Sequence, residues 1–298
     1  MEQKPEIKQE KSWYDKNYRF LMVIPILIVI ASLIYISFFY SQHKDFFLKD
    51  VSLSGGTTIT LTGNIDTEQL EAKLKQKFSD ISIRKLTDLK TGSIIASIIE
   101  SSSEPEPLKQ EIEAILGYKL DEKNSSIEFS GPTLGENFYR QLITALIISF
   151  ILMSIVIFIL FKTLIPSIAV IFAAFSDIVM SLALLDFLGI RISVAGIAAF
   201  LMLIGYSVDT DILLTTRALK KREGTLNRRI YSAFRTGIFM TLTALAAVLP
   251  AFFIVTGLPD SFRQIFMILA LGLTADIINT WLTNAGIIKW YCDKKGIR

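Results

Sequence analysis

Six long apolar runs limit what this chain can fold into more than any other feature of its sequence. The hydrocarbon core of a bilayer is about 30 Å thick, so a helix needs roughly 20 apolar residues to cross it. The runs are Phe20 to Tyr40, Leu142 to Phe161, Leu164 to Leu188, Ile192 to Leu214, Ile238 to Val255 and Phe266 to Trp290. They predict a polytopic α-helical membrane protein with six transmembrane helices.

The composition supports this class and excludes several others. Hydrophobic residues make up 51% of the chain and charged residues 20%, whereas charged residues make up about 25% of a typical soluble domain. The single cysteine, Cys292, cannot form an internal disulfide, and the single histidine, His43, excludes a His/Cys metal cluster. The sequence has no phosphate-binding loop and no Ser-His arrangement, so it predicts no enzyme activity, no cofactor, no metal and no nucleic-acid partner.

The charges between the runs predict the orientation. With the N-terminus inside, seventeen Lys and Arg residues lie in segments assigned to the cytoplasm, and the two short outer loops hold only Arg191 and Arg263. Because cytoplasmic loops are enriched in Lys and Arg, we expect both termini in the cytoplasm of a plasma-membrane protein. The predicted organisation is a cytoplasmic segment 1–19, a first helix 20–40, an extracytoplasmic domain 41–141, a five-helix transmembrane bundle 142–291 and a cytoplasmic tail 292–298.

The long outer segment has the pattern of a folded α+β domain. Alternating apolar residues and turn signals predict strands, and amphipathic stretches predict helices. The expected elements are a strand Val51 to Leu61 with a bulge at Gly55-Gly56, a helix Glu68 to Phe78, strands Ile81 to Leu86 and Ser93 to Ile99 around a turn at Asp88 to Gly92, a helix Pro107 to Leu116, and a strand Ser126 to Phe129. This βαββαβ order predicts a ferredoxin-like domain.

Acidic residues within the apolar runs are the candidate functional residues. An acid at bilayer depth costs several kcal/mol and usually faces protein or water. Asp209 and Asp211 point about 200° apart on one helix, so they cannot share one lipid-facing stripe. They are either a polar pair near a helix end or part of an ion path. For Asp177 and Asp276, structural pairing and ion handling are equally compatible with the sequence.

Four motifs, in this order along the chain, resemble the SecF family of the SecDF accessory complex, which belongs to the RND-type permease group. Gly55-Gly56 begins the outer domain, Gly131-Pro132 leads into the second run, Gly205-Tyr206-Ser207 lies in the fourth, and Arg235 precedes the fifth. Bacterial relatives have Gly-Tyr-Ser-x-Asn-Asp-Thr in the fourth run, whereas this chain has Asp209, Thr210 and Asp211 at the last three positions. The departure resembles the archaeal branch.

The resemblance implies an auxiliary subunit of protein export. Its implied partners are SecD, the Sec translocon channel, the translocating polypeptide and membrane lipid, and its implied energy source is a proton or sodium gradient. Asp211 is the first candidate for the ion pathway, followed by Asp209, and pairing with Arg235 would switch the proton affinity of these acids. The alternatives are a small-molecule or lipid exporter of the RND group and a passive anchor for a partner.

Overall fold

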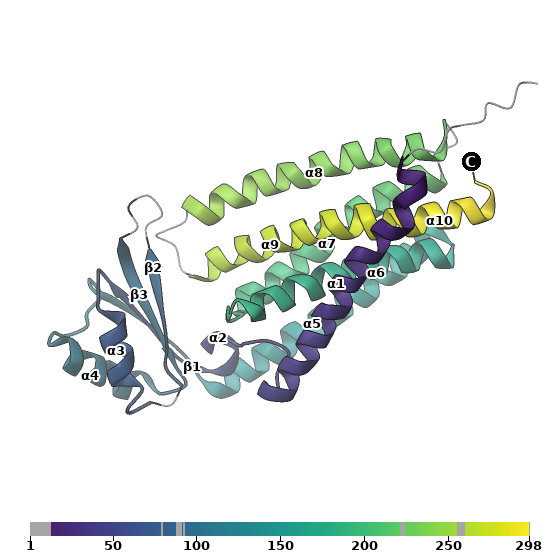
Figure 1. Cartoon of the computed structure of the whole chain (residues 1–298). Helices are drawn as coiled ribbons and strands as arrows, with labels where there is room; N and C mark the ends of the chain where they lie inside the picture. The colour runs from purple at the N-terminus through teal and green to yellow at the C-terminus, as the bar shows by residue number, and fades with distance from the viewer. Residues whose placement is uncertain are drawn as a thin grey trace, which may run out of the picture.

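The computed structural model describes residues 13–78, 80–87, 91, 93–220, 224–254 and 260–297. A bundle of long helices carries a small sheet domain at one end, and the start of α1 and the end of α10 lie at the opposite end (Figure 1). Residues 1–12 of the predicted N-terminal segment, Lys221 and Arg222 of the basic loop, and most of the predicted turn at Asp88 to Gly92 lie outside the described residues.

Six helical segments in the described part of the chain are long and apolar enough to cross a membrane, as predicted. They are α1 (Trp13–His43), α5 (Pro132–Phe161), α6 (Leu164–Phe187), α7 (Val194–Leu219), α8 (Leu226–Ile254) and a last segment made of α9 (Asp260–Ile278), a π-helix η1 (Asn279–Asn284) and α10 (Ala285–Lys295). α5 begins well before its apolar run because Gly131 is the N-cap and Pro132 takes the first helical position, where a missing N–H costs nothing.

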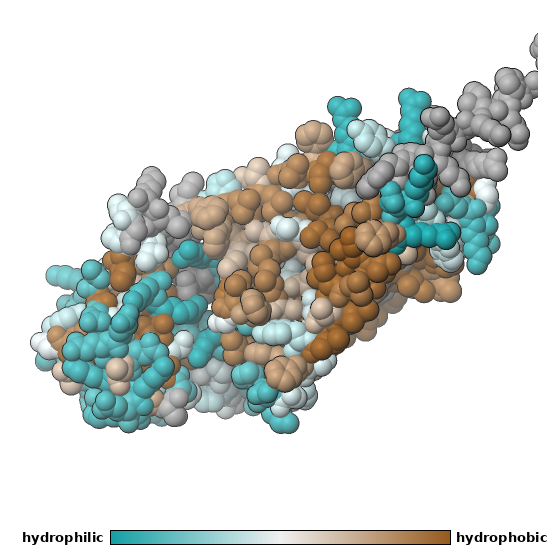
Figure 2. Space-filling model, in the orientation of Figure 1, coloured by the Kyte–Doolittle hydropathy of each residue, from teal (hydrophilic) through white to brown (hydrophobic). Residues whose placement is uncertain are grey.

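The surface of the molecule fits a membrane protein with two polar ends. Hydrophobic residues cover the middle of the helix bundle, whereas hydrophilic residues cover the sheet domain and the far end of the helices (Figure 2). The helices differ in how much they bury. In α6 and α7, 56% of the most apolar window is buried inside the molecule, against 6% in α5 and 11% in α8. α6, α7 and the last segment therefore form the core, and α5 and α8 expose wide apolar faces.

The sheet domain has the predicted ferredoxin-like topology. Its elements are β1 (Gly56–Thr62), α3 (Thr67–Leu74), β2 (Ser82–Thr87), β3 (Ile94–Ser101), α4 (Pro105–Leu116) and β4 (Ser125–Ser130). The strands are antiparallel in the order β2-β3-β1-β4. Ile59 and Ile99 of the central strands pack against Leu70 of α3 and Leu108 of α4, and all four side chains are fully buried. The Asp66 carboxylate caps α3 by accepting bonds from the backbone N–H groups of Glu68 and Gln69.

The predicted strand from Val51 to Leu61 is wrong at its beginning. Val51 to Ser54 form a short helix, α2, and β1 begins only at Gly56. Gly55 has φ +82°, and a Cβ added there would lie 2.4 Å from the Cα of Pro132. A Cβ on Gly135 would in turn lie 2.6 Å from the backbone nitrogen of Gly55. Gly55 therefore serves close packing of α2 on the start of α5, and two of the sequence motifs meet at this contact.

α7 lies at the centre of the helix bundle, where it packs against α5, α6, α8 and α9. Small residues allow these helices to approach closely, as membrane helix interfaces require. A Cβ added to Gly272 of α9 would lie 2.3 Å from the Leu203 side chain of α7, and one added to Gly196 of α7 would lie 2.5 Å from Gln264 of α9. This close packing brings the polar side chains of α6, α7 and the last segment together inside the bundle.

Candidate functional site

Three acidic side chains from three different helical segments meet in the core of the bundle. Asp177 comes from α6, Asp211 from α7 and Asp276 from α9, and each has an exposed fraction of 0%. We call these three residues the acid cluster. Its position is set by the core helices α6, α7 and α9, which bury about half of their apolar windows. Lipid and bulk water are therefore both kept from these carboxylates.

Neutral donors surround Asp177. Its Oδ1 accepts a hydrogen bond from the Asn279 amide nitrogen at 2.7 Å, and its Oδ2 accepts one from the Ser207 hydroxyl. Ser207 lies on α7 and Asn279 begins η1. Asp177 thus joins α6 to two other helical segments. Ser207, the last residue of the Gly205-Tyr206-Ser207 motif, thus bonds to Asp177.

Asp211 and Asp276 are also held by neutral donors, and they share one of them. Asp211 Oδ1 lies 2.7 Å from the Asn284 amide nitrogen and 2.8 Å from Thr280 Oγ1. Asp276 Oδ1 lies 2.9 Å from the same Thr280 oxygen and 3.0 Å from Thr210 Oγ1. The Thr280 hydroxyl therefore stands between two carboxyl groups.

Among the described residues, no Lys or Arg side chain lies within 4.0 Å of a carboxylate of the acid cluster. In the described ranges, every Lys–Asp, Lys–Glu, Arg–Asp or Arg–Glu pair within 4.0 Å lies elsewhere in the molecule. Three oxygens of the cluster and its neighbours are buried and, among the described residues, accept no hydrogen bond: Asp211 Oδ2, Asn279 Oδ1 and Asn284 Oδ1. Buried polar atoms are seldom left unsatisfied. This arrangement leaves lone pairs available for a proton, a small cation or water.

The other predicted site residues lie outside the acid cluster. Asp209 and Tyr206 are exposed on one face of α7 with Gly205, opposite the face that carries Asp211. Arg235 is exposed on α8, where it lines a groove of about 770 Å³ with Tyr231 and other residues. Within the part of the chain that the structure describes, no hydrogen bond or ion pair links Arg235 to either Asp209 or Asp211. The pairing proposed from the sequence is thus not formed in this conformation.

Sequence reasoning missed Asn279, Thr280 and Asn284, which bond to the acids, although the sequence contains a signal for them in the form of a polar stripe. Asp276, Asn279, Thr280, Thr283 and Asn284 recur at intervals of three and four in an otherwise apolar segment. This interval puts polar residues on one helix face, the reverse of the usual amphipathic pattern. All five are almost completely buried. A search for polar stripes in apolar helices would have found them.

The helix that carries this stripe is locally irregular. Residues Asn279–Asn284 form a π-helix between α9 and α10. A π-turn inserts one extra residue per turn and is frequent at functional sites. Here Asn279 bonds to Asp177 at one end of the π-helix, and Asn284 bonds to Asp211 at the other. The π-helix thus presents both amides to the acid cluster.

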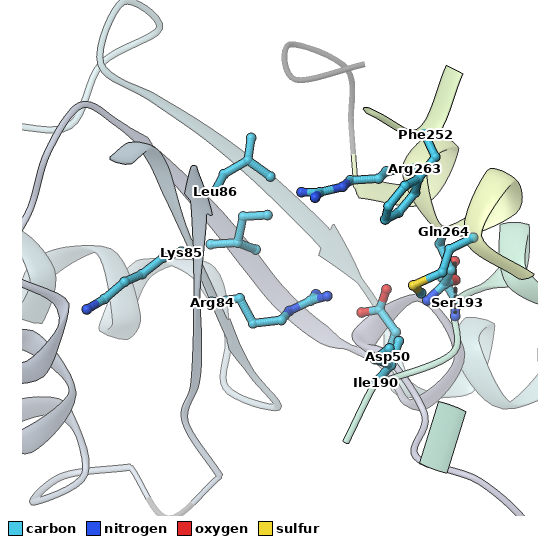
Figure 3. Close-up of a pocket in the computed structure, with 11 residues that line it drawn as sticks. Asp50, Arg84, Lys85, Leu86, Ile190, Ser193, Phe252, Arg263 and Gln264 are labelled. Atoms are coloured by element: carbon cyan, nitrogen blue, oxygen red, sulfur yellow. Dashed lines mark hydrogen bonds between the residues drawn. The ribbon is translucent and has the colours of Figure 1, made fainter. Parts of the chain in front are cut away.

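A second group of charged residues lies where the sheet domain meets the helix ends, with one acid buried and one partly buried, and we call it the junction cluster. It consists of Asp50, before α2, Arg84 of β2, Glu100 of β3 and Arg191 of the α6–α7 loop. Glu100 is 1% exposed, bonds to the Arg84 guanidinium, and lies 3.6 Å from Arg191. Figure 3 shows Arg84 pointing toward Asp50 across a cavity of about 200 Å³. Each junction acid therefore has a fixed cation nearby.

Burial dominates the electrostatics of the junction cluster. It raises the pKa of Glu100 above its ordinary value of 4.5, although the charges of Arg84 and Arg191 oppose the shift. Burial likewise raises the pKa of Asp50 above its ordinary value of 3.8 against the same two arginines. Desolvation penalises the charged form of a carboxyl group, so these two acids bind protons more tightly when the sheet domain is docked than they would in water.

Neutral hydrogen bonds complete the junction. Gln264 of α9 accepts bonds from the backbone N–H and the hydroxyl of Ser193, and its amide donates to the Arg191 carbonyl. The backbone of Asp50 donates to the Ile192 carbonyl at 3.0 Å, and Ile192 donates to the Leu48 carbonyl at 2.7 Å. The α6–α7 loop is therefore bonded both to α9 and to the chain that enters the sheet domain.

Comparison with known proteins gives consistent matches over nearly the whole chain. Residues 111–294 match the family model described as protein export membrane protein SecD/SecF, C-terminal. The chain is 37% identical to the protein-export membrane protein SecF of Methanolacinia petrolearia, over 96% of this chain and 99% of that one. It is also 37% identical to the SecF of Methanocaldococcus jannaschii, over 93% and 96%.

Two solved structures share the fold. SecDF from Thermus thermophilus superposes with a TM-score of 0.73 at 17% identity, covering 97% of this chain and 40% of that one. SecDF in a super-membrane-facing form superposes with a TM-score of 0.61 at 17% identity, covering 99% and 41%. This chain thus spans about two fifths of each SecDF chain that it matches. At this identity the likeness concerns the fold alone.

Proposed function

This chain belongs to the SecF family of protein-export membrane proteins, and from that premise we propose that it promotes protein export as an auxiliary subunit driven by a proton or sodium gradient. Family membership confirms the resemblance drawn from the sequence, and it also confirms that the chain is a multi-pass membrane protein of transport rather than an enzyme. The ion coupling, the partners and the orientation are the parts that we propose.

The acid cluster is the observation that supports ion coupling. Asp177, Asp211 and Asp276 are fully buried and accept hydrogen bonds from hydroxyl and amide groups. An isolated ionised carboxylate in a medium of low dielectric constant is strongly disfavoured and becomes neutral or binds a cation. A site that needs a mobile positive charge, and has no fixed one among its described neighbours, is suited to taking up and releasing a gradient ion.

A SecD partner would explain the polar surface that α7 exposes. Asp209 lies on an exposed face of α7 with Met202, Gly205 and Tyr206. A carboxylate that faces lipid from a membrane helix costs several kcal/mol of free energy, whereas a carboxylate that faces another protein avoids that cost. The exposed groove around Arg235 on α8 is a second surface of this kind. We propose that SecD covers both surfaces, so that the roles of Asp209 and Arg235 depend on this partner.

We place the sheet domain outside the cytoplasm, where it contacts the polypeptide that emerges from the Sec channel, and both termini inside. The support is the excess of Lys and Arg at the helix ends away from the sheet domain. In a Cys292→Ala background, cysteines at Ser102 and Asn124 should react with a membrane-impermeant thiol reagent from outside, and a cysteine at Thr225 should not. Reversed labelling would overturn the orientation.

Ion coupling is tested by comparing Asp211→Asn with Asp293→Asn, a change of the same type at an exposed position near the C-terminus. Both variants are reconstituted with SecD and the Sec channel in proteoliposomes, and export of a model preprotein is measured with and without an imposed proton or sodium gradient. Asp211→Asn should bind SecD normally but lose the gradient-dependent stimulation, about tenfold or more. Asp293→Asn should retain it.

The passive-anchor alternative predicts a different result. If Asp211→Asn, Asp209→Asn and the double variant all support full stimulation at normal expression, the intramembrane acids are dispensable and the chain only stabilises its partner. If the chain were instead an exporter of small molecules, it would have to bind the transported compound. Its sheet domain is small for forming a conduit for such a compound. The export assay therefore decides between coupling and anchoring.

A further inference from the structure

The Thr280 hydroxyl lies within hydrogen-bond distance of two carboxyl groups of the acid cluster at once. Its Oγ1 lies 2.8 Å from Asp211 Oδ1 and 2.9 Å from Asp276 Oδ1. Both distances are typical of hydrogen bonds between oxygens. A threonine hydroxyl carries one hydrogen, so it can donate to only one of the two carboxyl groups at a time. The second contact must be filled by a hydrogen from the other carboxyl group.

Hydrogen counting thus gives two equivalent arrangements of the same atoms. In the first, Asp276 is protonated and donates to Thr280, which donates to ionised Asp211. In the second, Asp211 is protonated and donates to Thr280, which donates to ionised Asp276. The two arrangements differ only in which carboxyl group carries the proton. Two oxygens at this distance without a hydrogen between them would repel, so the geometry favours one shared proton on the pair.

We propose that the Thr280 hydroxyl relays protons between Asp276 and Asp211, a step that rests on the proposed ion coupling and specifies the ion as a proton. In the relay, the Asp276 O–H bond breaks and its hydrogen bonds to Thr280 Oγ1, while the Thr280 O–H bond breaks and its hydrogen bonds to Asp211 Oδ1. Thr280 ends as a neutral hydroxyl, one proton has moved from α9 to α7, and no oxidant or reductant is required.

The surroundings fit a relay through protein atoms. Asp211, Asp276 and Thr280 each have an exposed fraction of 0%, so bulk water does not reach the gap between the carboxyl groups. Thr280 lies one helical turn after Asp276 and in η1, whose Asn284 also holds Asp211. Among the described residues, Thr280 Oγ1 is the only side-chain oxygen within hydrogen-bond distance of both Asp211 Oδ1 and Asp276 Oδ1. It therefore lies between the two acids.

The proposal is tested with Thr280→Val, which keeps the shape of the side chain but removes the hydroxyl, and with Thr280→Ser, which restores it. Thr283→Val is the matched control, because Thr283 is also buried in η1 and, among the described residues, its hydroxyl bonds to no side chain or backbone group. Each full-length variant is reconstituted with SecD, and proton flux under an imposed pH gradient is measured with a pH-sensitive dye trapped in the vesicles.

Thr280→Val should lower the proton flux about tenfold or more, since proton transfer by a positioned group typically contributes that much or more. Thr280→Ser should restore the flux to within about threefold, and Thr283→Val should leave it within about twofold of the wild type. SecD co-purification and thermal unfolding establish that each variant is folded. If Thr280→Val does not fold, Thr280→Ala supplies the same test with a smaller side chain.

The outcomes separate the relay from the function on which it rests. Wild-type flux in Asp211→Asn and Asp276→Asn would overturn the proposed ion coupling. Loss of flux in these two variants together with wild-type flux in Thr280→Val would overturn the relay alone. Stimulation of export by a sodium gradient, without any dependence on a pH gradient, would also overturn the relay and keep the coupling. Equal losses in Thr280→Val and Thr280→Ser would assign Thr280 a packing role.

Discussion

Inside the helix bundle, the three acids of the acid cluster accept hydrogen bonds from hydroxyl and amide groups, whereas at the junction Glu100 lies between Arg84 and Arg191. Both clusters remove carboxyl groups from water, and both lie between elements distant in the sequence. They differ in the source of positive charge. At the junction Arg84 and Arg191 supply it, whereas among the described residues no Lys or Arg side chain lies within 4.0 Å of an acid-cluster carboxylate.

This difference separates a structural use of buried acids from a transport use. A fixed ion pair holds two parts of a protein in register, and removing one partner leaves an uncompensated charge. A cluster without a fixed cation can change its charge by taking up a proton or cation, and helices that share the cluster can respond to that change. The contacts of the junction cluster thus join the sheet domain to the helix ends, and those of the acid cluster fit the ion coupling proposed above.

The largest expected effect comes from neutralising one acid in each cluster. Asp276→Asn should abolish gradient-dependent stimulation of export, because the variant side chain can no longer take up a proton. Glu100→Gln should retain stimulation to within about twofold, because the junction acid only has to hold the sheet domain in place. The measurement is export in proteoliposomes with and without the gradient. Equal losses in the two variants would contradict the division of roles.

The sequence predicted the spans and the sheet domain because these depend on local patterns. Apolar runs of sufficient length define Leu164–Phe187 as a helix regardless of its neighbours, and a cap at Asp66 and a stop at Gly117 define the two domain helices. The acid cluster depends instead on which helix faces meet. The sequence identified Asp177, Asp211 and Asp276 as unusual, but the bond between Ser207 and Asp177 follows from packing of α6 on α7.

Two other features also lay beyond sequence reasoning. The short helix at Val51–Ser54 ends at Gly55, which packs against Pro132, a contact between residues far apart in the chain. The role of Asp209 depends on what contacts its exposed face, which the pattern of this chain alone does not specify. Patterns within one chain thus predict elements well, whereas sites made by packing or by a second subunit need the assembled structure.

The next largest effect is expected at the close contact between α2 and the start of α5. Gly55→Ala should lower the stability of the protein by about 3 kcal/mol, because a non-glycine residue at positive φ costs about 1–2 kcal/mol and overpacking against Pro132 adds about 1–3 kcal/mol. Gly117→Ala is the matched control. Gly117 has φ +78°, but a Cβ there would meet nothing within 4 Å, so only the backbone cost of about 1–2 kcal/mol should appear.

Thermal unfolding of the two variants in the same detergent provides the measurement. A larger shift for Gly55→Ala than for Gly117→Ala supports the close approach of α2 to α5. Equal shifts would mean that backbone conformation alone explains the requirement for glycine, and that the contact with Pro132 contributes little.

The pH dependence of docking should be smaller but specific to the junction. Because burial raises the pKa of Asp50 and Glu100, the docked state binds protons more tightly than an undocked one. The resulting stabilisation of docking is fully present below the ordinary values of 3.8 and 4.5 and is lost as the pH rises through the docked-state values. Spin labels at Asn124 and Leu188 should report an undocked population that grows as the pH rises through the docked-state pKa values of the two acids.

Glu100→Gln should reduce this pH dependence, since its side chain does not titrate, and Glu111→Gln is the control at an exposed pair within the sheet domain.

A related contrast involves Asp80. Burial raises its pKa, but bonds from Ser102 and Ser101 outweigh burial and lower it overall, so its contribution to stability is lost as the pH falls below 3.8. Acid should thus loosen the β2–β3 end of the sheet while it favours docking.

The smallest effect is expected from an ion pair that resembles the junction in chemistry but not in burial. Lys77 bonds to Glu111 on the surface of the sheet domain, and the Lys77 side chain is 63% exposed. Water screens such a pair, so Lys77→Met should change the stability of the domain by at most about 0.5 kcal/mol, seen as hydrogen-exchange protection of β1 and β3. Arg84→Met removes a cation from Glu100, which is 1% exposed, and should cost several times more. If the two substitutions lower the stability by the same amount, burial does not determine how strongly an ion pair stabilises the junction. Arg84 would then stabilise the position of the sheet domain no more than a surface lysine does.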